Sequence, residues 1–245
     1  MPTSLAPKLL AEFIGTFAFV FIGAGAAAVV GDGAGLNGIG AIAFAHGLTI
    51  MVFAFAYGSL SGGHMNPAVT VGVLAAGAIR LRDALGYIVS QLAGGIAGAL
   101  LLRAVLGGTT TGLGTPQLAH GLVLGATTVT IVPAAGFVIE ALLAFFLVTT
   151  VLSTAVAGRA GNLAPLAIGM TLTFNIIMGG ALTGAPFNPA RTLGPMVATG
   201  NFTDVWLYMI APIVGAVIAA LVHLGLTRLA REQSITPRAA ATPAE

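Results

Sequence analysis

The sequence predicts an all-α membrane protein with six transmembrane helices and two re-entrant half-helices, arranged as an inverted repeat. Three observations lead to this fold class. The chain of 245 residues is 57% hydrophobic and only 7% charged, whereas a soluble domain carries about 25% charged residues. Six apolar stretches are each long enough to cross a bilayer. One polar tripeptide, Asn-Pro-Ala, occurs in both halves of the chain.

The six apolar stretches define the organisation of the chain. They cover roughly residues 9–30, 39–58, 84–106, 135–157, 163–182 and 205–227, and a membrane-spanning helix needs about 20 residues. We interpret residues 1–245 as one transmembrane domain, with repeat one at about 8–106 and repeat two at about 135–228. The polar tail from Glu232 to residue 245 is expected to be disordered.

Basic residues set the predicted orientation. With six alternating spans, seven of the nine Lys and Arg residues fall on one side, and only Arg103 and Arg191 fall elsewhere. The positive-inside rule then places both termini in the cytoplasm. Lys8 precedes the first apolar run without a cleavage site, so we expect that run to be retained as a span. Short termini and a preference for Arg over Lys favour a prokaryotic plasma (inner) membrane.

Composition excludes several function classes. The chain has no cysteine, so it offers no disulfide, thiolate nucleophile or Cys-ligated metal. No basic stripe is present that could bind nucleic acid. No nucleophile, metal cluster or paired carboxylate has the spacing of an active site. We therefore expect no enzyme activity, no catalytic residue, no cofactor and no metal.

The two Asn-Pro-Ala boxes are the most informative motif. Their residues are Asn66, Pro67 and Ala68, and then Asn188, Pro189 and Ala190, at an offset of 122 residues. Asn is a good helix N-cap and Pro suits the first helical position, so a single box would indicate only a helix start. Two boxes followed by short helix-competent segments, at 69–79 and 191–198, instead predict half-helices at a repeat interface.

Two half-helices that meet head to head bring their positive dipole ends together. The carboxamides of Asn66 and Asn188 add N–H donors at that point. A water molecule that accepts from both cannot also accept from its neighbour in a file of waters. Proton hopping would be interrupted there, and cations would be repelled.

The paired boxes, Arg191 after the second box, and Glu12 and Glu140 on the first and fourth spans resemble the aquaporin (major intrinsic protein) family. The resemblance extends from about Lys8 to Arg228. It implies one pore per subunit in a homotetramer within the lipid bilayer, with water and small neutral solutes as cargo. The barrier to protons and cations derived above is already described for aquaporins.

The resemblance also implies a selectivity filter. Counting from the boxes gives His46, Ile176, Ala185 and Arg191. This set is similar to that of tonoplast-type aquaporins, and His46 supplies a polar edge that can change protonation near neutral pH. His120 in the long external loop is a candidate support for Arg191, with a solvated histidine as the alternative. His64 is expected in the inner vestibule.

Three buried polar residues have a structural interpretation. Glu12, Glu140 and Gln91 lie within predicted spans. A carboxylate in a span, such as Glu12 or Glu140, by default suggests a functional site. No chain of partners for a proton relay is visible. We therefore expect these residues to accept or donate hydrogen bonds to the re-entrant loops and to maintain the shape of the pore.

The expected function is a passive channel for water, with ammonia and hydrogen peroxide as further candidate cargoes. The first alternative is a glycerol or small neutral solute facilitator of the same family. Thr192 after Arg191, a short segment before the last span, and Tyr208 on that span argue against glycerol as the main cargo. The second alternative, an ion-coupled secondary transporter, would need charged groups at the midplane, and only the two glutamates are candidates.

Overall fold

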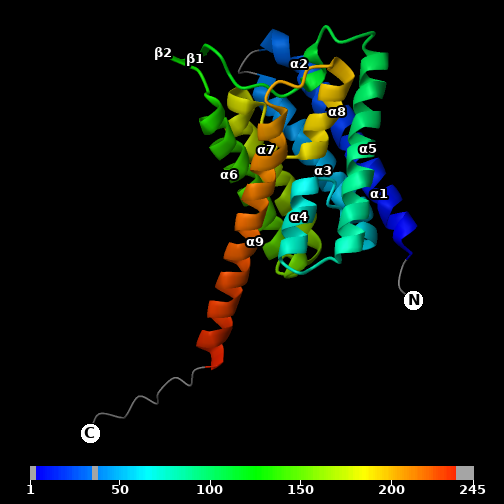
Figure 1. Cartoon of the computed structure of the whole chain (residues 1–245), viewed down its shortest axis with the longest axis vertical. Helices are drawn as coiled ribbons and strands as arrows, with labels where there is room; N and C mark the ends of the chain where they lie inside the picture. The colour runs from blue at the N-terminus through cyan, green and yellow to red at the C-terminus, as the bar shows by residue number, and fades with distance from the viewer. Residues whose placement is uncertain (1–3, 35–37, 236–245) are drawn as a thin grey trace.

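In a computed structural model the chain forms a bundle of long helices that enclose two shorter ones (Figure 1). The structure describes residues 4–34 and 38–235. Within these residues, six helical stretches are long and apolar enough to cross a membrane. They are Leu5–Gly31, Ile39–Ser61, Leu81–Val105, Pro133–Val156, Gly161–Thr183 and Val205–Glu232. The predicted six-span fold class is confirmed.

The elements follow the duplication seen in the sequence. The first half contains α1 (Leu5–Ala18), η1 (Phe19–Ala24), α2 (Gly25–Ala34), α3 (Ile39–Ser61), α4 (Pro67–Ala75) and α5 (Leu81–Val105). The connection contains η3 (Gly112–Gly114), β1 (Leu122–Leu124) and β2 (Thr127–Val129). The second half contains α6 (Pro133–Val151), η4 (Leu152–Val156), η5 (Gly161–Leu163), α7 (Ala164–Thr183), α8 (Pro189–Thr199) and α9 (Val205–Ile235). Segments η1 and η4 are π-helical turns inside the first and fourth spans.

The two half-helices α4 and α8 occupy the middle of the bundle, one above the other (Figure 1). With 9 and 11 residues they are too short to cross a bilayer. Each begins at the proline of a box, and the preceding asparagine is its N-cap. Both half-helices pack against α5 and α9, and they contact each other. The spans therefore shield their irregular entry loops from lipid, as such loops require.

The two ends of the bundle differ in their basic residues and in the segments that they contain. The first turn of α1, the α4–α5 connection and the last turns of α9 lie at one end (Figure 1). Five of the nine basic residues belong to these segments or to the adjoining first turn of α5, namely Lys8, Arg80, Arg82, Arg228 and Arg231. The β1–β2 hairpin lies at the opposite end, where Leu122 pairs with Val129 in antiparallel register. The predicted cytoplasmic face therefore corresponds to the end at which α1 begins.

Small residues let the spans approach closely. A Cβ atom added at Gly98 of α5 would lie 2.6 Å from the carbonyl oxygen of Phe17 in α1. Gly94, one turn earlier, faces the backbone of Phe13 in the same way. Such contacts suit membrane helices, whose association depends on close packing rather than on a hydrophobic driving force.

The predicted disordered tail begins too early. Helix α9 continues to Ile235, so residues 232–235 are helical. An exposed ion pair at 2.8 Å joins Arg228 Nε to Glu232 Oε1 across one turn of this helix. Pairs of this kind stabilise a helix by a few tenths of a kcal/mol. The rest of the predicted tail, residues 236–245, lies outside the described residues.

Candidate pore and selectivity filter

The first box starts α4 and reaches across to the second box. The Asn66 side chain accepts a hydrogen bond from the N–H of Ala68 at 2.8 Å, which satisfies one donor of the helix start. Its amide nitrogen donates to the carbonyl of Phe187 at 3.1 Å. Asn66 is 3% exposed. One side chain therefore caps a half-helix and links it to the opposite repeat.

The second box repeats this arrangement in reverse. The Asn188 side chain accepts from the N–H groups of Ala190 and Arg191, at 3.0 and 3.2 Å. Its amide nitrogen donates to the carbonyl of Met65 at 2.9 Å. Each asparagine thus donates to the residue that precedes the other asparagine, and the two boxes are joined by a reciprocal pair of bonds.

A narrow cavity runs beside both asparagines. Its volume is about 20 Å³, enough for about one water molecule. A carboxamide carries two N–H donors, and the cross-link uses one on each asparagine. The second N–H of each is free to face the cavity. The two half-helix N-termini therefore offer a passing molecule two donors and little room.

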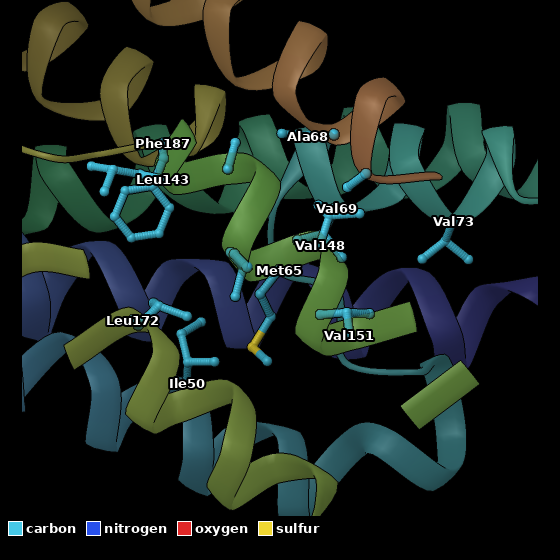
Figure 2. Close-up of a cluster of buried hydrophobic side chains, with 14 of the residues drawn as sticks. Ile50, Met65, Ala68, Val69, Val73, Leu143, Val148, Val151, Leu172 and Phe187 are labelled. Carbon is cyan, nitrogen blue, oxygen red and sulfur yellow. The ribbon is translucent and has the colours of Figure 1, made fainter. Parts of the chain in front are cut away.

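The rest of the cavity wall is mainly apolar. It includes Ile50, Val69, Val151, Leu172 and Phe187. Figure 2 shows these side chains gathered in one buried cluster, contributed by both repeats. An apolar wall gives a water molecule few competing partners, so the donors on the asparagines dominate its orientation.

A wide vestibule leads to this cavity from the end at which α1 begins. Its volume is about 1060 Å³, and Lys8, Arg80 and Asp83 are among the residues that line it. His64 lines both the vestibule and the narrow cavity. His64 Nδ1 lies 3.1 Å from Thr70 Oγ1, and its ring stacks edge-on against Tyr87. His64 therefore lies where the vestibule narrows.

A buried carboxylate holds the entry loop of each half-helix. Glu12 accepts from the N–H of His64 at 2.9 Å and from the N–H of Met65 at 2.6 Å. Glu140 accepts from the N–H of Phe187 at 2.8 Å. Both glutamates are completely buried. Their bonds satisfy loop N–H groups that lack a partner in regular secondary structure, which is the loop-holding arrangement described above.

Met65 and Phe187 are residues of the entry loops whose role the sequence did not reveal. Both have positive φ, +49° and +28°, a conformation that costs a non-glycine residue about 1–3 kcal/mol. In each, the N–H binds a glutamate and the carbonyl binds an asparagine. These bonds offset the strain. The available signal was their position, since each directly precedes a box asparagine.

Two tyrosines form a further duplicated pair. Tyr87 donates to the carbonyl of Ser61 at 2.7 Å, and Tyr208 donates to the carbonyl of Thr183 at 2.8 Å. Each carbonyl lies at the last residue of a span, just before an entry loop. Tyr208 is completely buried. It therefore belongs, with Tyr87, Glu12 and Glu140, to the set of side chains that hold the two entry loops by hydrogen bonds, which we call the frame.

Gln91 has no counterpart in the second half. Its amide donates to Glu12 Oε2 at 2.7 Å and to Thr70 Oγ1 at 2.9 Å. Four residues after Tyr208, where a counterpart would stand, the sequence has Pro212. Thr192, the counterpart of Thr70, has a buried hydroxyl without a hydrogen-bond partner among the described residues. The first loop is thus held by more hydrogen bonds than the second.

Arg191 lies in the first turn of α8 and is 3% exposed. Its Nη1 donates to the carbonyl of Gly114 in η3 at 2.6 Å, and its Nε approaches His46 Nε2 at 3.4 Å. These contacts use two of the five N–H donors of the guanidinium. The long connection between the repeats, through Gly114, therefore helps to fix the arginine.

The partners of His46 define its tautomer. Its Nδ1 lies 2.8 Å from the carbonyl of Ile42, and a carbonyl can only accept a hydrogen bond. The hydrogen is therefore assigned to Nδ1, which leaves Nε2 as the acceptor for Arg191. Both ring nitrogens have a protein partner. The polar edge expected from the sequence is thus directed at Arg191.

The remaining filter candidates are buried but make no polar contact with Arg191. Ile176 and Ala185 are each 2% exposed and lie in the same apolar cluster. Ala185 has a φ of +40° and follows Thr183, whose hydroxyl accepts from its N–H. His120 is exposed, and Gly114 takes the position next to Arg191 that the sequence suggested for His120.

Known proteins share this architecture. An X-ray structure of the aquaglyceroporin from Plasmodium falciparum matches with a TM-score of 0.77, covering 94% of this chain and all of that one. Its sequence identity is 22%, so this likeness concerns the fold alone. It agrees with six spans and two half-helices.

Several curated proteins are more similar to this chain in sequence than that structure is. "Aquaporin TIP1-2" of Zea mays is 41% identical over 226 residues, which are 89% of this chain and 85% of the relative. "Probable aquaporin TIP2-2" of Oryza sativa subsp. japonica is 40% identical over 223 residues, covering 87% and 84%. "Nodulin-26" of Glycine max is 36% identical, covering 88% and 76%. These relatives come from plants and give no support to the expected prokaryotic plasma membrane.

A model of one protein family covers nearly the whole chain. The family is described as "Major intrinsic protein", and its model matches residues 2–223. Together with the fold and the paired boxes, this match shows that the chain is a multi-pass integral membrane protein and belongs to the major intrinsic protein family.

Proposed function

We propose that this protein is a passive channel that conducts water and excludes protons and ions. The observation that carries the proposal is the pair of cross-linked asparagines beside a cavity of about 20 Å³. Two of the relatives are named aquaporins, which agrees with water as cargo.

The exclusion of protons follows from the donors at the boxes. A water oxygen that accepts from both Asn66 and Asn188 has its two lone pairs occupied, so it cannot accept from the next water. Its hydrogens then point away along the pore in both directions, and the hydrogen-bonded file is interrupted. The N-termini of α4 and α8 add positive potential at the same point, which repels cations.

The filter extends the candidate cargo beyond water. His46, Ile176, Ala185 and Arg191 combine one cation, one polar ring and two apolar walls. Three N–H donors of Arg191 are not used by Gly114 and His46 and can bind a small neutral acceptor. We include ammonia and hydrogen peroxide, which are near water in size, as additional cargoes. Glycerol is larger, and we expect it to pass poorly.

A flux assay tests the proposal. Liposomes that contain the purified protein should shrink faster under osmotic shock than empty liposomes, with a low activation energy. The same vesicles should take up ammonia faster, measured with an internal pH dye, and glycerol little faster. Equal water rates in protein-containing and empty vesicles would refute a water channel. A glycerol rate above the water rate would favour the facilitator, and saturable, ion-dependent uptake would favour a transporter.

A filter exchange separates the cargo assignment from the pore itself. The double substitution His46→Phe with Ile176→His changes two of the four proposed filter residues and leaves both boxes intact. Water flux should persist while ammonia flux falls. An ammonia flux equal to that of the unmodified protein would contradict the assignment of these residues to the filter.

We also propose that the subunits form a homotetramer, with both termini in the cytoplasm. The resemblance to aquaporins supports the assembly, and the basic residues near the start of α1 and the end of α9 support the orientation. Mass measurement of the detergent-solubilised complex tests the first statement. Protease access to the C-terminal tail in sealed right-side-out vesicles tests the second, since a tail cleaved from outside contradicts it.

A further inference from the structure

One stretch of the first span lies against both groups that hold Arg191. This stretch is η1, in which the helix widens to a π-helical turn. Such turns are rare and often occur at functional sites. The boxes belong to the half-helices, and nothing in the motifs of this chain assigns a role to η1.

The first group that η1 touches is the imidazole of His46. The ring of Phe19 stacks edge-on against it, with ring centroids 5.3 Å apart. Gly23 lies one turn further along and faces the same ring. A Cβ atom added at Gly23 would lie 2.5 Å from Cδ2 and 2.8 Å from Nε2 of His46. Nε2 is also the atom that accepts from Arg191.

The second contact of η1 is with Gly114, whose carbonyl accepts a hydrogen bond from Arg191. A Cβ atom added at Gly114 would lie 2.7 Å from the carbonyl oxygen of Ala24, the last residue of η1. The two backbones are therefore in direct contact. Adjacent residues of one helical turn, Gly23 and Ala24, thus lie against His46 and Gly114, the two residues that accept hydrogen bonds from Arg191.

We propose that Gly23 is a positioning residue of the selectivity filter, whose missing side chain leaves the space in which His46 accepts a hydrogen bond from Arg191. The proposal rests on the channel function proposed above and adds a residue to its filter. Any side chain at this position forces the imidazole away from η1. Because Nδ1 remains bound to Ile42, the ring cannot retreat freely, and Nε2 moves relative to Arg191.

The required displacement is large for a water-sized opening. Non-bonded carbon atoms prefer a separation of about 3.5–4.0 Å, so the ring must move by roughly 1 Å from its contact of 2.5 Å. Inserting a methyl group into a filled site displaces the surrounding side chains. We expect the displaced imidazole to narrow the filter and to lower the flux about tenfold.

The test measures water and ammonia flux per folded channel for Gly23→Ala in two backgrounds. In the otherwise unmodified protein we expect a fall of about tenfold, equivalent to about 1.4 kcal/mol. In a His46→Ala background the ring is absent, so adding Gly23→Ala should change neither flux. Gly31→Ala is the matched control on the same span, because a Cβ there meets nothing within 4 Å.

The outcomes separate this proposal from its alternatives. Equal flux for the unmodified protein and Gly23→Ala overturns it, as does an equal fall in both backgrounds, which would indicate a packing defect independent of His46. If Gly23→Ala fails to fold, the double variant decides. If the double variant with Gly23→Ala and His46→Ala folds, the contact between Gly23 and His46 is supported. If the double variant also fails to fold, the proposal is overturned. Unmodified protein that conducts no water would instead refute the channel function.

Discussion

Substitution of the two buried glutamates should have unequal effects, because their hydrogen-bond environments differ. Glu12 accepts four hydrogen bonds, from the Ser61 hydroxyl, the Gln91 amide and the N–H groups of His64 and Met65, at 2.6–2.9 Å. All four partners act as donors. The glutamine of Glu12→Gln keeps one acceptor oxygen and replaces the other with an NH₂ group.

Neither orientation of that glutamine side chain satisfies the site. If the NH₂ group takes the place of Oε2, it faces the N–H of Met65; if it takes the place of Oε1, it faces the N–H of His64. One loop N–H is left without its protein acceptor in both cases. That loss costs about 1–3 kcal/mol, and hydrogen bonds to a charged group that become neutral lose about 1 kcal/mol more. We expect Glu12→Gln to lower the free energy of unfolding by about 3 kcal/mol.

Glu140→Gln is the matched control. Glu140 accepts from the N–H of Phe187 and from the hydroxyl of Thr183. A glutamine can keep its oxygen toward Phe187 and direct its NH₂ group at Thr183. The hydroxyl can accept that bond and donate instead to the carbonyl of Gly179, which lies at 3.4 Å. All groups stay paired, so only the change from a charged to a neutral acceptor remains, and the loss should be about 1 kcal/mol.

Unfolding in detergent, followed by the helical circular dichroism signal against increasing denaturant, measures both changes. Water flux in liposomes shows whether the folded fraction still conducts. The reasoning is refuted if Glu140→Gln destabilises the protein as much as Glu12→Gln does. It is also refuted if Glu12→Gln leaves the free energy of unfolding unchanged.

Two further substitutions test the frame and the filter. Tyr208→Phe removes the 2.8 Å hydrogen bond to the carbonyl of Thr183 and should lower the free energy of unfolding by about 1 kcal/mol. The water flux per folded channel should not change. Reduced flux at unchanged stability would instead place Tyr208 in the pore. Arg191→Val copies Val69 from the first repeat and removes the filter charge. Since a unit charge about 4 Å away is worth a few kcal/mol at reduced dielectric, proton leak measured with an internal pH dye should rise about tenfold or more. An unchanged leak would show that the boxes alone exclude protons.

Much of the fold could be predicted because lipid imposes strong rules on sequence. The six spans follow from length and hydrophobicity, and the half-helices follow from boxes that are too close to neighbouring spans to start another one. The N-cap roles of Asn66 and Asn188 follow from the preferences of Asn and Pro at a helix start. These are local properties of the sequence.

The contacts that fix the filter could not be predicted, because they depend on segments far apart in the chain. Gly114 and Arg191 are brought together only by the tertiary fold. The π-helical turn at Phe19–Ala24 has no sequence pattern that separates it from an ordinary apolar helix. His120 was a candidate support for Arg191 through the resemblance to tonoplast-type aquaporins, with a solvated histidine as the alternative, whereas Arg191 donates to a backbone carbonyl, that of Gly114.

The frame is present in both repeats, whereas the proposed filter arginine is present in only one. Glu12 and Glu140, Tyr87 and Tyr208, and the two box asparagines hold two equivalent loops, and these shared bonds give the pore its shape. Shape alone distinguishes solutes only by their size.

The proposed filter adds a charge on one side of the boxes, and a buried guanidinium is stable there only if its donors find acceptors. The first repeat has Val69 at the position of Arg191, so it needs no such acceptors. The second repeat obtains them from His46 and Gly114, which lie outside the half-helix. A functional arginine at this position therefore depends on the first span, whose glycine at position 23 leaves the space for the imidazole. Introducing an arginine at Val69 without such acceptors should leave a buried, unpaired cation and destabilise the channel rather than create a second filter.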